Sequence, residues 1–412
     1  GKEIHRVEWN AKETSPPRLL ALSPDGKTAA LGLQSYTKMM VLLDLTTGKV
    51  QHRFDLKGEV SQIQGVSFTA DSRTVLVWSS GDNRLRLWDV ATGRQLRQFV
   101  MTDKYGRDDA FAASYVAAVS PSGRHLVFGS QRRVLALYDI DTGHEINRSD
   151  ELDYNPVNGR LMVFSPSGKT LAWLGGDQRT VHLVERATFH ERHSFVAPQG
   201  EIASLTFSAD GRMLLAGNTD TTTLVWDLTG RLRDKARGDV RLPIGKLKVY
   251  WTDLATNDGP RVHRAIHELA ASPKDAIPYL QTRLQPALVL DDKRILRLIT
   301  ELDSEDFKTR ENATRELDTL EERGLEFYRK ALQAKPPLEL RRRLLALVEK
   351  YSTPWRNPSR ERLRSLRTLE VLELAGTPEA RQMLEALAKG APESWLTAEA
   401  KEALDRLRRR PS

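Results

Sequence analysis

Two histidine pairs are the residues whose spacing could support metal chemistry. His263 and His267 lie four residues apart in a predicted helix, so both imidazoles could face one metal ion. Glu268 follows them but points about 100° away around the helix, and no third ligand has a matching spacing. His190 and His193 lie in a predicted strand or turn. We interpret both pairs as surface or packed histidines, and we predict no metal site and no cofactor.

Arginines form the strongest clusters of charge, and guanidinium groups are what a phosphate or another anion requires. The candidate anion-binding residues are Arg341, Arg342, Arg343, Arg360, Arg364, Arg367, Arg408 and Arg409. Three of them are consecutive and therefore spread over most of a helical turn, and neighbouring glutamates reduce the positive field. A solvated helix surface is the favoured interpretation. Binding of nucleic acid or another anion is the alternative.

No other catalytic constellation stands out. The chain has no cysteine, which excludes disulfides, thiolate metal sites and a cysteine nucleophile. There is no glycine-rich phosphate loop and no serine elbow, and Gly175-Gly176-Asp177 fits an ordinary hairpin turn. No apolar run approaches the roughly 20 residues that span a bilayer. We therefore predict a protein that is not an enzyme, takes no small-molecule substrate and does not enter the membrane.

The net charge of +8 is unevenly distributed along the 412 residues. Residues 1–230 hold about 26 basic and 26 acidic side chains, whereas the rest hold about 37 and 29, so the excess lies in the second half. The compartment is unknown: a cytoplasmic location is favoured, and export is the alternative if a signal sequence precedes Gly1.

A repeat of about 42–50 residues organises the first half. Each unit has a turn of small residues between two β-prone runs, and a third run ends in an aromatic or aliphatic residue followed by an acid. The turns lie at 23–26, 69–72, 120–123, 165–168 and 208–211. The repeat residues at the end of the third run are Asp44, Trp88, Asp89, Tyr138, Asp139, Glu185, Trp226 and Asp227.

Four short strands per unit bury both sheet faces only if similar sheets pack radially around an axis. Trp88 and Trp226 would then lie on the third strands, wedged between sheets, and the following acid would satisfy backbone donors. On these motifs, residues 1–230 resemble the WD40 family, which implies a disc-shaped propeller that presents loops to protein partners. The usual Gly-His pair is missing, and Val184-Glu185 replaces the Trp-Asp pair. We expect these blades to depend more on apolar packing.

About five blades are visible, fewer than the seven most common in WD40 rings. One account is a fragment that lacks upstream blades. The other is a closed ring of five, in which the strand Gly1–Trp9 pairs with the last blade after Trp226-Asp227.

The second half has helical spacing of apolar residues, with about seven or eight helices and short connections. Predicted helix caps are Ser272, Ser304, Ser359, Thr377 and Thr397. Phe307–Leu332 resembles a HEAT-like helix pair. The tail as a whole resembles that of planctomycete-type bacterial WD40 proteins, on Trp251-Thr252-Asp253-Leu254, Ala276-Ile277-Pro278-Tyr279-Leu280 and Gly376-Thr377-Pro378-Glu379-Ala380.

These observations predict a multidomain β + α chain: WD40-type β-propeller blades over 1–230, a linker over 231–246, and an all-α domain over 247–412. The predicted function is a non-enzymatic scaffold that binds protein partners through propeller loops and the helical surface. The alternative is an accessory protein that binds nucleic acid or anions through its arginine-rich helices.

Overall fold

Two compact units make up the chain in the computed structural model, Gly1–Leu228 and Thr229–Ser412. The structure describes residues 17–33, 39–56, 62–69, 71–80, 84–100, 116–129, 135–149, 161–229, 241–289, 291–352 and 358–409. Most of the predicted linker 231–246 lies outside these residues, and helix α1 (Ile244–Asp253) begins within it.

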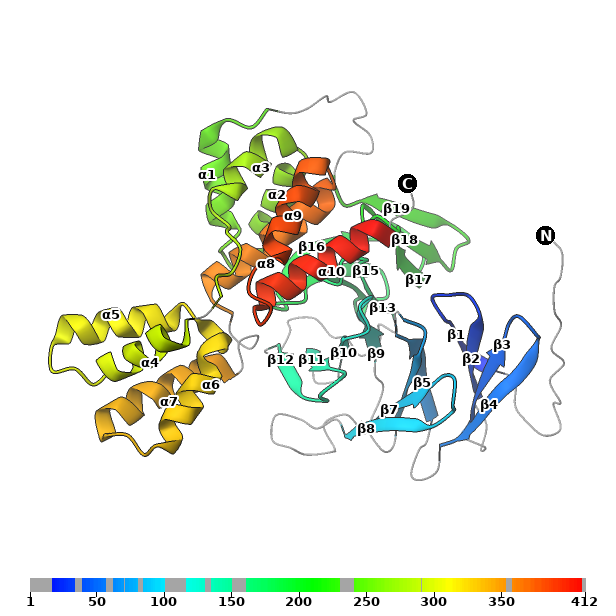
Figure 1. Cartoon of the computed structure of the whole chain (residues 1–412). Coiled ribbons are helices and arrows are strands. Elements are labelled where there is room, and N and C mark those ends of the chain that lie inside the picture. Colours follow the sequence, from blue (N-terminus) through cyan, green and yellow to red (C-terminus); the bar gives the residue numbers. More distant parts are fainter. Residues whose placement is uncertain are drawn as a thin grey trace. The chain divides into compact units, whose positions relative to one another are not determined.

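The first unit consists of antiparallel sheets whose strands follow the order of the chain (Figure 1). Four sheets have four strands, and the fifth has three strands among the described residues. We call the sheets blades one to five. The strands are β1 (Pro17–Leu22), β2 (Thr28–Leu33), β3 (Met39–Asp44), β4 (Lys49–Asp55); β5 (Gln62–Phe68), β6 (Thr74–Ser80), β7 (Arg84–Asp89), β8 (Gln95–Val100); β9 (Val116–Val119), β10 (His125–Gly129), β11 (Leu135–Asp139), β12 (Glu145–Arg148); β13 (Met162–Phe164), β14 (Thr170–Leu174), β15 (Thr180–Glu185), β16 (Glu191–Val196); and β17 (Ile202–Phe207), β18 (Met213–Asn218), β19 (Thr223–Asp227). The predicted fold class is confirmed.

The turn between the first two strands of each blade explains the recurring pattern of small residues. In blade one the Ser23 hydroxyl donates to Asp25 Oδ1 (2.6 Å) and accepts from Thr28 N (2.8 Å). Gly26 has a φ of 70°, in the left-handed region that costs glycine little. These local bonds satisfy the turn's polar groups and so determine where the strand reverses.

The turn between the third and fourth strands of blade four departs from the repeat. Phe189 has a φ of 56°, at the place where the first three blades have Gly48, Gly93 and Gly143. A left-handed non-glycine residue costs about 1–3 kcal/mol. Phe189 is nevertheless 3% exposed and packs in the same cluster as Trp173. Burial of a phenylalanine ring contributes about 3–5 kcal/mol by comparison with truncation, so packing outweighs the backbone strain.

One apolar cluster joins each blade to the next, which confirms that the sheets pack face to face. In each cluster, buried side chains of one blade, many of them from its second and third strands, meet those of the following blade. The clusters pair Met40 and Leu42 with Val75 and Val77, Leu76 and Trp78 with Leu126 and Phe128, Val127 and Leu137 with Leu171 and Trp173, and Ala172 and Leu183 with Leu205 and Leu214.

The two alternatives for the ring, a fragment and a closed ring of five blades, remain predictions. The Gly1–Trp9 strand of the five-blade alternative lies outside the described residues. Within the described part of the chain, each sheet cluster joins consecutive blades, and none joins blade five to blade one.

The second unit is helical. Its described elements are α1, α2 (Gly259–Ala270), α3 (Pro273–Gln281), α4 (Asp292–Glu301), α5 (Phe307–Asp318), the 3-10 turn η2 (Glu321–Gly324), α6 (Leu325–Gln333), α7 (Leu338–Ser352), α8 (Arg360–Ala375), α9 (Pro378–Ala388) and α10 (Trp395–Arg409). Among these residues no helix is both long and apolar enough to cross a bilayer.

Side-chain caps begin several helices. Ser359 accepts from Arg362 N and Thr377 accepts from Ala380 N, so these two predicted caps are confirmed. The predicted cap Ser304 is wrong, because Asp306 accepts from Thr309 N and begins α5. An aspartate at this position also places negative charge at the positive end of the helix dipole.

Two apolar clusters organise the helices. One draws on α1–α3 and α8–α10, and the other, which we call the α4–α7 cluster, includes Leu298, Leu317, Tyr328 and Leu347. In that cluster α5 packs mainly on α4, and α6 packs mainly on α7. The two helices within Phe307–Leu332 therefore pack mainly on other helices, with the 3-10 turn η2 between them in the chain.

Candidate interaction surfaces

The acids of the repeat are used within their own turns. Asp44 accepts from the backbone N and hydroxyl of Thr46 at 2.7 and 2.6 Å. Asp89 and Asp139 do the same for the threonine three residues later, at distances between 2.7 and 2.9 Å. Asp227 ends β19 and is half-buried. The carboxylates of Asp44, Asp89 and Asp139 therefore stabilise local turns.

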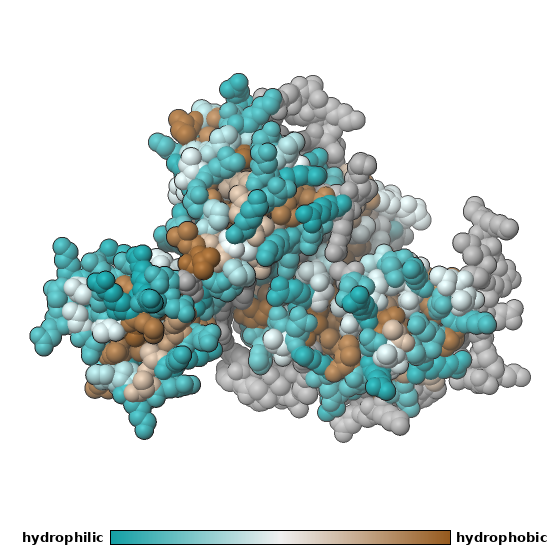
Figure 2. Space-filling view, in the orientation of Figure 1, coloured by the Kyte–Doolittle hydropathy of each residue, from teal (hydrophilic) through white to brown (hydrophobic). Residues whose placement is uncertain are grey.

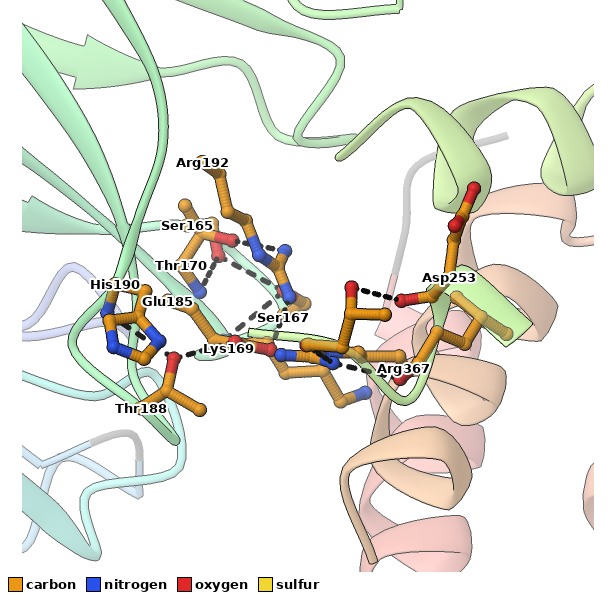
Figure 3. A network of polar contacts seen from close by, with 12 residues as sticks. Ser165, Ser167, Lys169, Thr170, Glu185, Thr188, His190, Arg192, Asp253 and Arg367 are labelled. Atoms are coloured by element: carbon orange, nitrogen blue, oxygen red, sulfur yellow. Dashed lines mark hydrogen bonds and ion pairs between the residues drawn. The ribbon is translucent and has the colours of Figure 1, made fainter. Parts of the chain in front are cut away.

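Blade four replaces the aspartate by Glu185, and a larger network results (Figure 3). Glu185 Oε2 accepts from the Thr188 hydroxyl at 2.7 Å, and Oε1 accepts from Arg192 Nη2 at 2.8 Å. Arg192 Nη1 also donates to the Thr170 hydroxyl at 3.1 Å. Both charged side chains are at least nine-tenths buried. The longer acid reaches an arginine on the neighbouring strand, so this network ties β14, β15 and β16 together.

The aromatic repeat residues lie between blades. The Trp88 ring lies 4.6 Å from that of Phe54 in blade one, and the Trp226 ring is stacked 5.2 Å from Phe195 in blade four. Tyr138 is 8% exposed, and its hydroxyl donates to Glu145. These rings are packing groups in the observed fold.

Acidification is expected to weaken the sheet unit through its turn aspartates. Hydrogen bonds from the threonine hydroxyl and then the backbone hold the pKa of Asp44 and of Asp89 below the usual value. A lowered folded-state pKa gives stability that is present above the unfolded value of about 4 and is lost as the pH falls through the folded value. We expect the urea concentration at the unfolding midpoint to decrease as the pH is lowered from about 5 to about 3. The decrease should be smaller in D44N/D89N, which lacks the two carboxylates.

The matched control for this acid effect is D55N, which changes an exposed aspartate on β4 outside the turns. Urea unfolding measures the acid sensitivity of each variant. If D44N/D89N loses as much stability in acid as the unchanged chain, Asp44 and Asp89 are not the cause of the loss.

A second feature is a group of loops at one end of blades four and five. Antiparallel strands place the second-to-third-strand loops and the blade-to-blade connections at the same end. Three such segments, 175–180, 197–201 and 218–222, are described, and we call them the loop surface. Thr219 N donates to Glu201 O at 2.8 Å, and Ile202 N donates to Gln178 O at 2.9 Å. Arg179 Nη2 donates to Ala197 O and Pro198 O.

The loop surface is therefore rigidly bonded yet exposed and acidic. Asp177, Glu201 and Asp220 are exposed, with Arg179 as the one base in these segments. Thr221 has a φ of 68°, which is uncommon for a β-branched residue. Backbone strain of this kind persists only where surrounding bonds hold it.

The structure disperses the predicted anion-binding arginines. On α7, Arg341 and Arg342 are exposed, and neither forms an ion pair with a described carboxylate. Arg343 is partly buried and forms an ion pair with Glu339 at 2.8 Å. The three consecutive residues thus have different environments, as their 100° spacing around a helix requires.

The arginines of α8 have mostly structural roles. Arg360 is exposed, whereas Arg364 donates to Glu361 and to the carbonyl of Trp251. Arg367 is 1% exposed and points at the turn after α1 (Figure 3). There it donates to the carbonyls of Leu254 (2.8 Å) and Thr256 (2.7 Å). Because Arg367 is buried and bonded to these carbonyls, it is not part of an exposed anion-binding surface.

The last helix contributes little to an anion site. Arg408 is exposed and lies 3.3 Å from Asp405, and the side chain of Arg409 is outside the described residues. His263 and His267 pack against each other with ring centroids 4.3 Å apart. In the part of the chain that the structure describes, no three histidine or acidic side chains gather in a way that could hold a metal.

Sequence reasoning missed the buried charges of the helical unit. Arg362 is 2% exposed, forms ion pairs with Glu322 at 2.7 Å, and lies 4.6 Å from the centre of the Trp395 ring. Glu373 is 1% exposed and accepts two hydrogen bonds from Arg406. The available signal was that the apolar residues of α8, with Val371 and Ala375 added to the leucines, are spread around the helix, which is typical of a helix buried all round.

Comparisons with known proteins place WD40 repeats in the sheet unit. The family model "WD domain, G-beta repeat" matches residues 48–89 and 189–227. The chain is 28% identical over 218 residues to guanine nucleotide-binding protein subunit beta-1 of Nicotiana tabacum, covering 50% of this chain and 56% of that protein. It is 27% identical to the beta subunits of Solanum tuberosum and Zea mays over 215 and 219 residues, with the same coverage. The chain spans about half the length of these relatives.

Proposed function

We propose that the chain is a non-enzymatic scaffold that binds protein partners, and that the loop surface of blades four and five is one contact site. The observation that carries the proposal is that this surface is exposed while its three segments are bonded to one another. A preorganised surface loses little conformational entropy on binding. The similar proteins are named as subunits of guanine nucleotide-binding proteins, that is, as parts of a protein assembly.

The polar groups support a binding role over catalysis. The repeat acids hold turns, Glu185 and Arg192 bind each other, and Arg367 caps carbonyls. Each of these groups serves the fold. The resemblance of the helical unit to planctomycete-type tails and HEAT pairs remains a prediction.

The nucleic-acid alternative now rests on few residues. Of the eight candidate arginines, Arg341, Arg342 and Arg360 are the exposed ones without an ion pair among the described residues. Nucleic-acid binding at physiological salt usually draws on many phosphate contacts. A scaffold is therefore the better-supported function.

Site-specific photo-crosslinking of the full chain tests the proposal in cells of the source organism. A photoreactive residue at Gln199 of the loop surface should give discrete protein adducts that E201R/D220R removes. The same probe at Ala91, an exposed residue in a turn at the other end of the blades, is the control. Equal adducts at both positions, or adducts removed by nuclease, would overturn the proposal.

A further inference from the structure

Helix α7 carries an exposed surface that the packing of the α4–α7 cluster does not use. Leu338 is 83% exposed and Leu345 is 48% exposed. Arg341 and Arg342 lie between them, also exposed. The spacing i, i+3, i+4 and i+7 places all four on one helix face. We call these four residues the α7 surface.

The other face of the same helix is the one that packs. Leu344, Leu347 and Tyr351 are at most 7% exposed and lie in the apolar core of the α4–α7 cluster. The α7 surface is thus additional to what the fold requires. Figure 2 shows apolar side chains among hydrophilic ones on the exterior of this cluster.

Exposed basic residues outnumber exposed acids on and beside the α7 surface, although the exposed Glu349 lies on the same helix face one turn after Leu345. Lys330 at the end of α6 and Lys335 in the following turn are exposed. Glu339, the nearest acid at the start of the helix, is already paired with Arg343. Neither Arg341 nor Arg342 has an ion-pair partner among the described carboxylates.

We propose that the α7 surface docks an acidic amphipathic helix of a partner protein. This inference rests on the scaffold function proposed above and names a second contact site with its partner class. Two leucines seven residues apart are about 10.5 Å apart along a helix axis. That spacing matches apolar side chains two turns apart on a partner helix, which is how helix-in-groove partners present their anchors.

The positive charge and the two leucines of the α7 surface together favour an acidic amphipathic helix over a nucleic acid or a membrane. Acidic side chains beside the partner's apolar stripe complement Arg341 and Arg342 and set its orientation. A nucleic acid would satisfy the arginines but leave Leu338 and Leu345 exposed. A membrane-surface helix needs a wide apolar face, whereas the broad apolar face of α7 is buried in the cluster core.

Fluorescence anisotropy with the full chain tests the inference. The probe is a labelled 16-residue peptide with leucines on one helical face and glutamates elsewhere. A peptide of the same composition with the leucines scattered around the helix is the reference. We expect the patterned peptide to bind more tightly. L338S/L345S should weaken its binding by about tenfold or more, as loss of two buried leucine contacts implies.

The charged residues are tested by a matched pair of variants. R341Q/R342Q should weaken binding several-fold at low salt and flatten the salt dependence. K293Q/K308Q removes the same charge from exposed lysines of α4 and α5 in the same cluster and should change binding less than twofold. Thermal unfolding establishes that each variant retains the fold.

Several outcomes would overturn the inference. These are equal binding of the two peptides, equal effects of the arginine and lysine variants, and tighter binding of an oligonucleotide or anionic vesicle that L338S/L345S leaves unchanged. Concentration-dependent self-association lost in the same variants would assign the surface to a second copy instead. If the peptide does not bind the α7 surface while crosslinking at Gln199 succeeds, the α7 site is excluded and the proposed scaffold function is still supported.

Discussion

Replacement of Gly65 by alanine should destabilise the sheet unit by about 3 kcal/mol, the upper range for overpacking a core. A Cβ at Gly65 would lie 1.8 Å from Cζ2 of Trp78. The Trp78 ring is 7% exposed and packs with Leu126 and Phe128 of the next blade. The ring cannot move without disturbing the contact between blades two and three. Urea unfolding followed by circular dichroism measures the loss.

Two further variants separate the clash from the general cost of losing a glycine. Gly26 has a left-handed φ, but a Cβ there would meet nothing within 4 Å. G26A should therefore cost only the strain of a left-handed alanine, about 1–2 kcal/mol. In G65A/W78L the smaller side chain leaves room, so the double variant should be more stable than the sum of the single effects predicts. A G65A loss no larger than that of G26A would contradict the argument.

Replacement of Arg406 by methionine should destabilise the helical unit by about 3–5 kcal/mol. Arg406 donates to both carboxylate oxygens of Glu373, at 2.9 and 3.0 Å, and Glu373 is 1% exposed. The variant removes this bidentate partner from a carboxylate that water does not reach. Thermal and urea unfolding measure the effect.

The paired variant E373M/R406M distinguishes a stranded charge from lost packing. Exchanging both partners for apolar side chains of similar size is often close to neutral, so much of the stability should return. R408M is the control, because Arg408 is exposed beside Asp405 and such surface pairs contribute about 0–1 kcal/mol. A double variant as unstable as R406M would show that the ion pair itself stabilises the unit.

The architecture could be predicted because it depends on local patterns. Ser23, Asp25 and Gly26 satisfy one another within a single turn, so the same residues recur wherever a blade begins its second strand. Helix caps such as Thr377 act within one turn of the chain. Interactions between near neighbours in sequence leave a readable pattern.

The arginines show where such reasoning stops. Arg341 and Arg367 are the same residue type in charged helical segments, yet one is exposed and the other is 1% exposed with two carbonyl acceptors. Those carbonyls lie more than 100 positions earlier in the chain. Neither the composition nor the helical spacing shows which arginine will be buried against those carbonyls.

By itself the sequence determined the repeating blades, the helical second half and the places where turns and caps form, because dihedral preferences and alternation of apolar residues act over a few residues. Only the tertiary structure decided which charges are buried, that Phe189 accepts a left-handed backbone, and that Leu338 and Leu345 are left exposed. These outcomes depend on contacts between segments distant in sequence, where burial of apolar area and satisfaction of buried charge outweigh local preference.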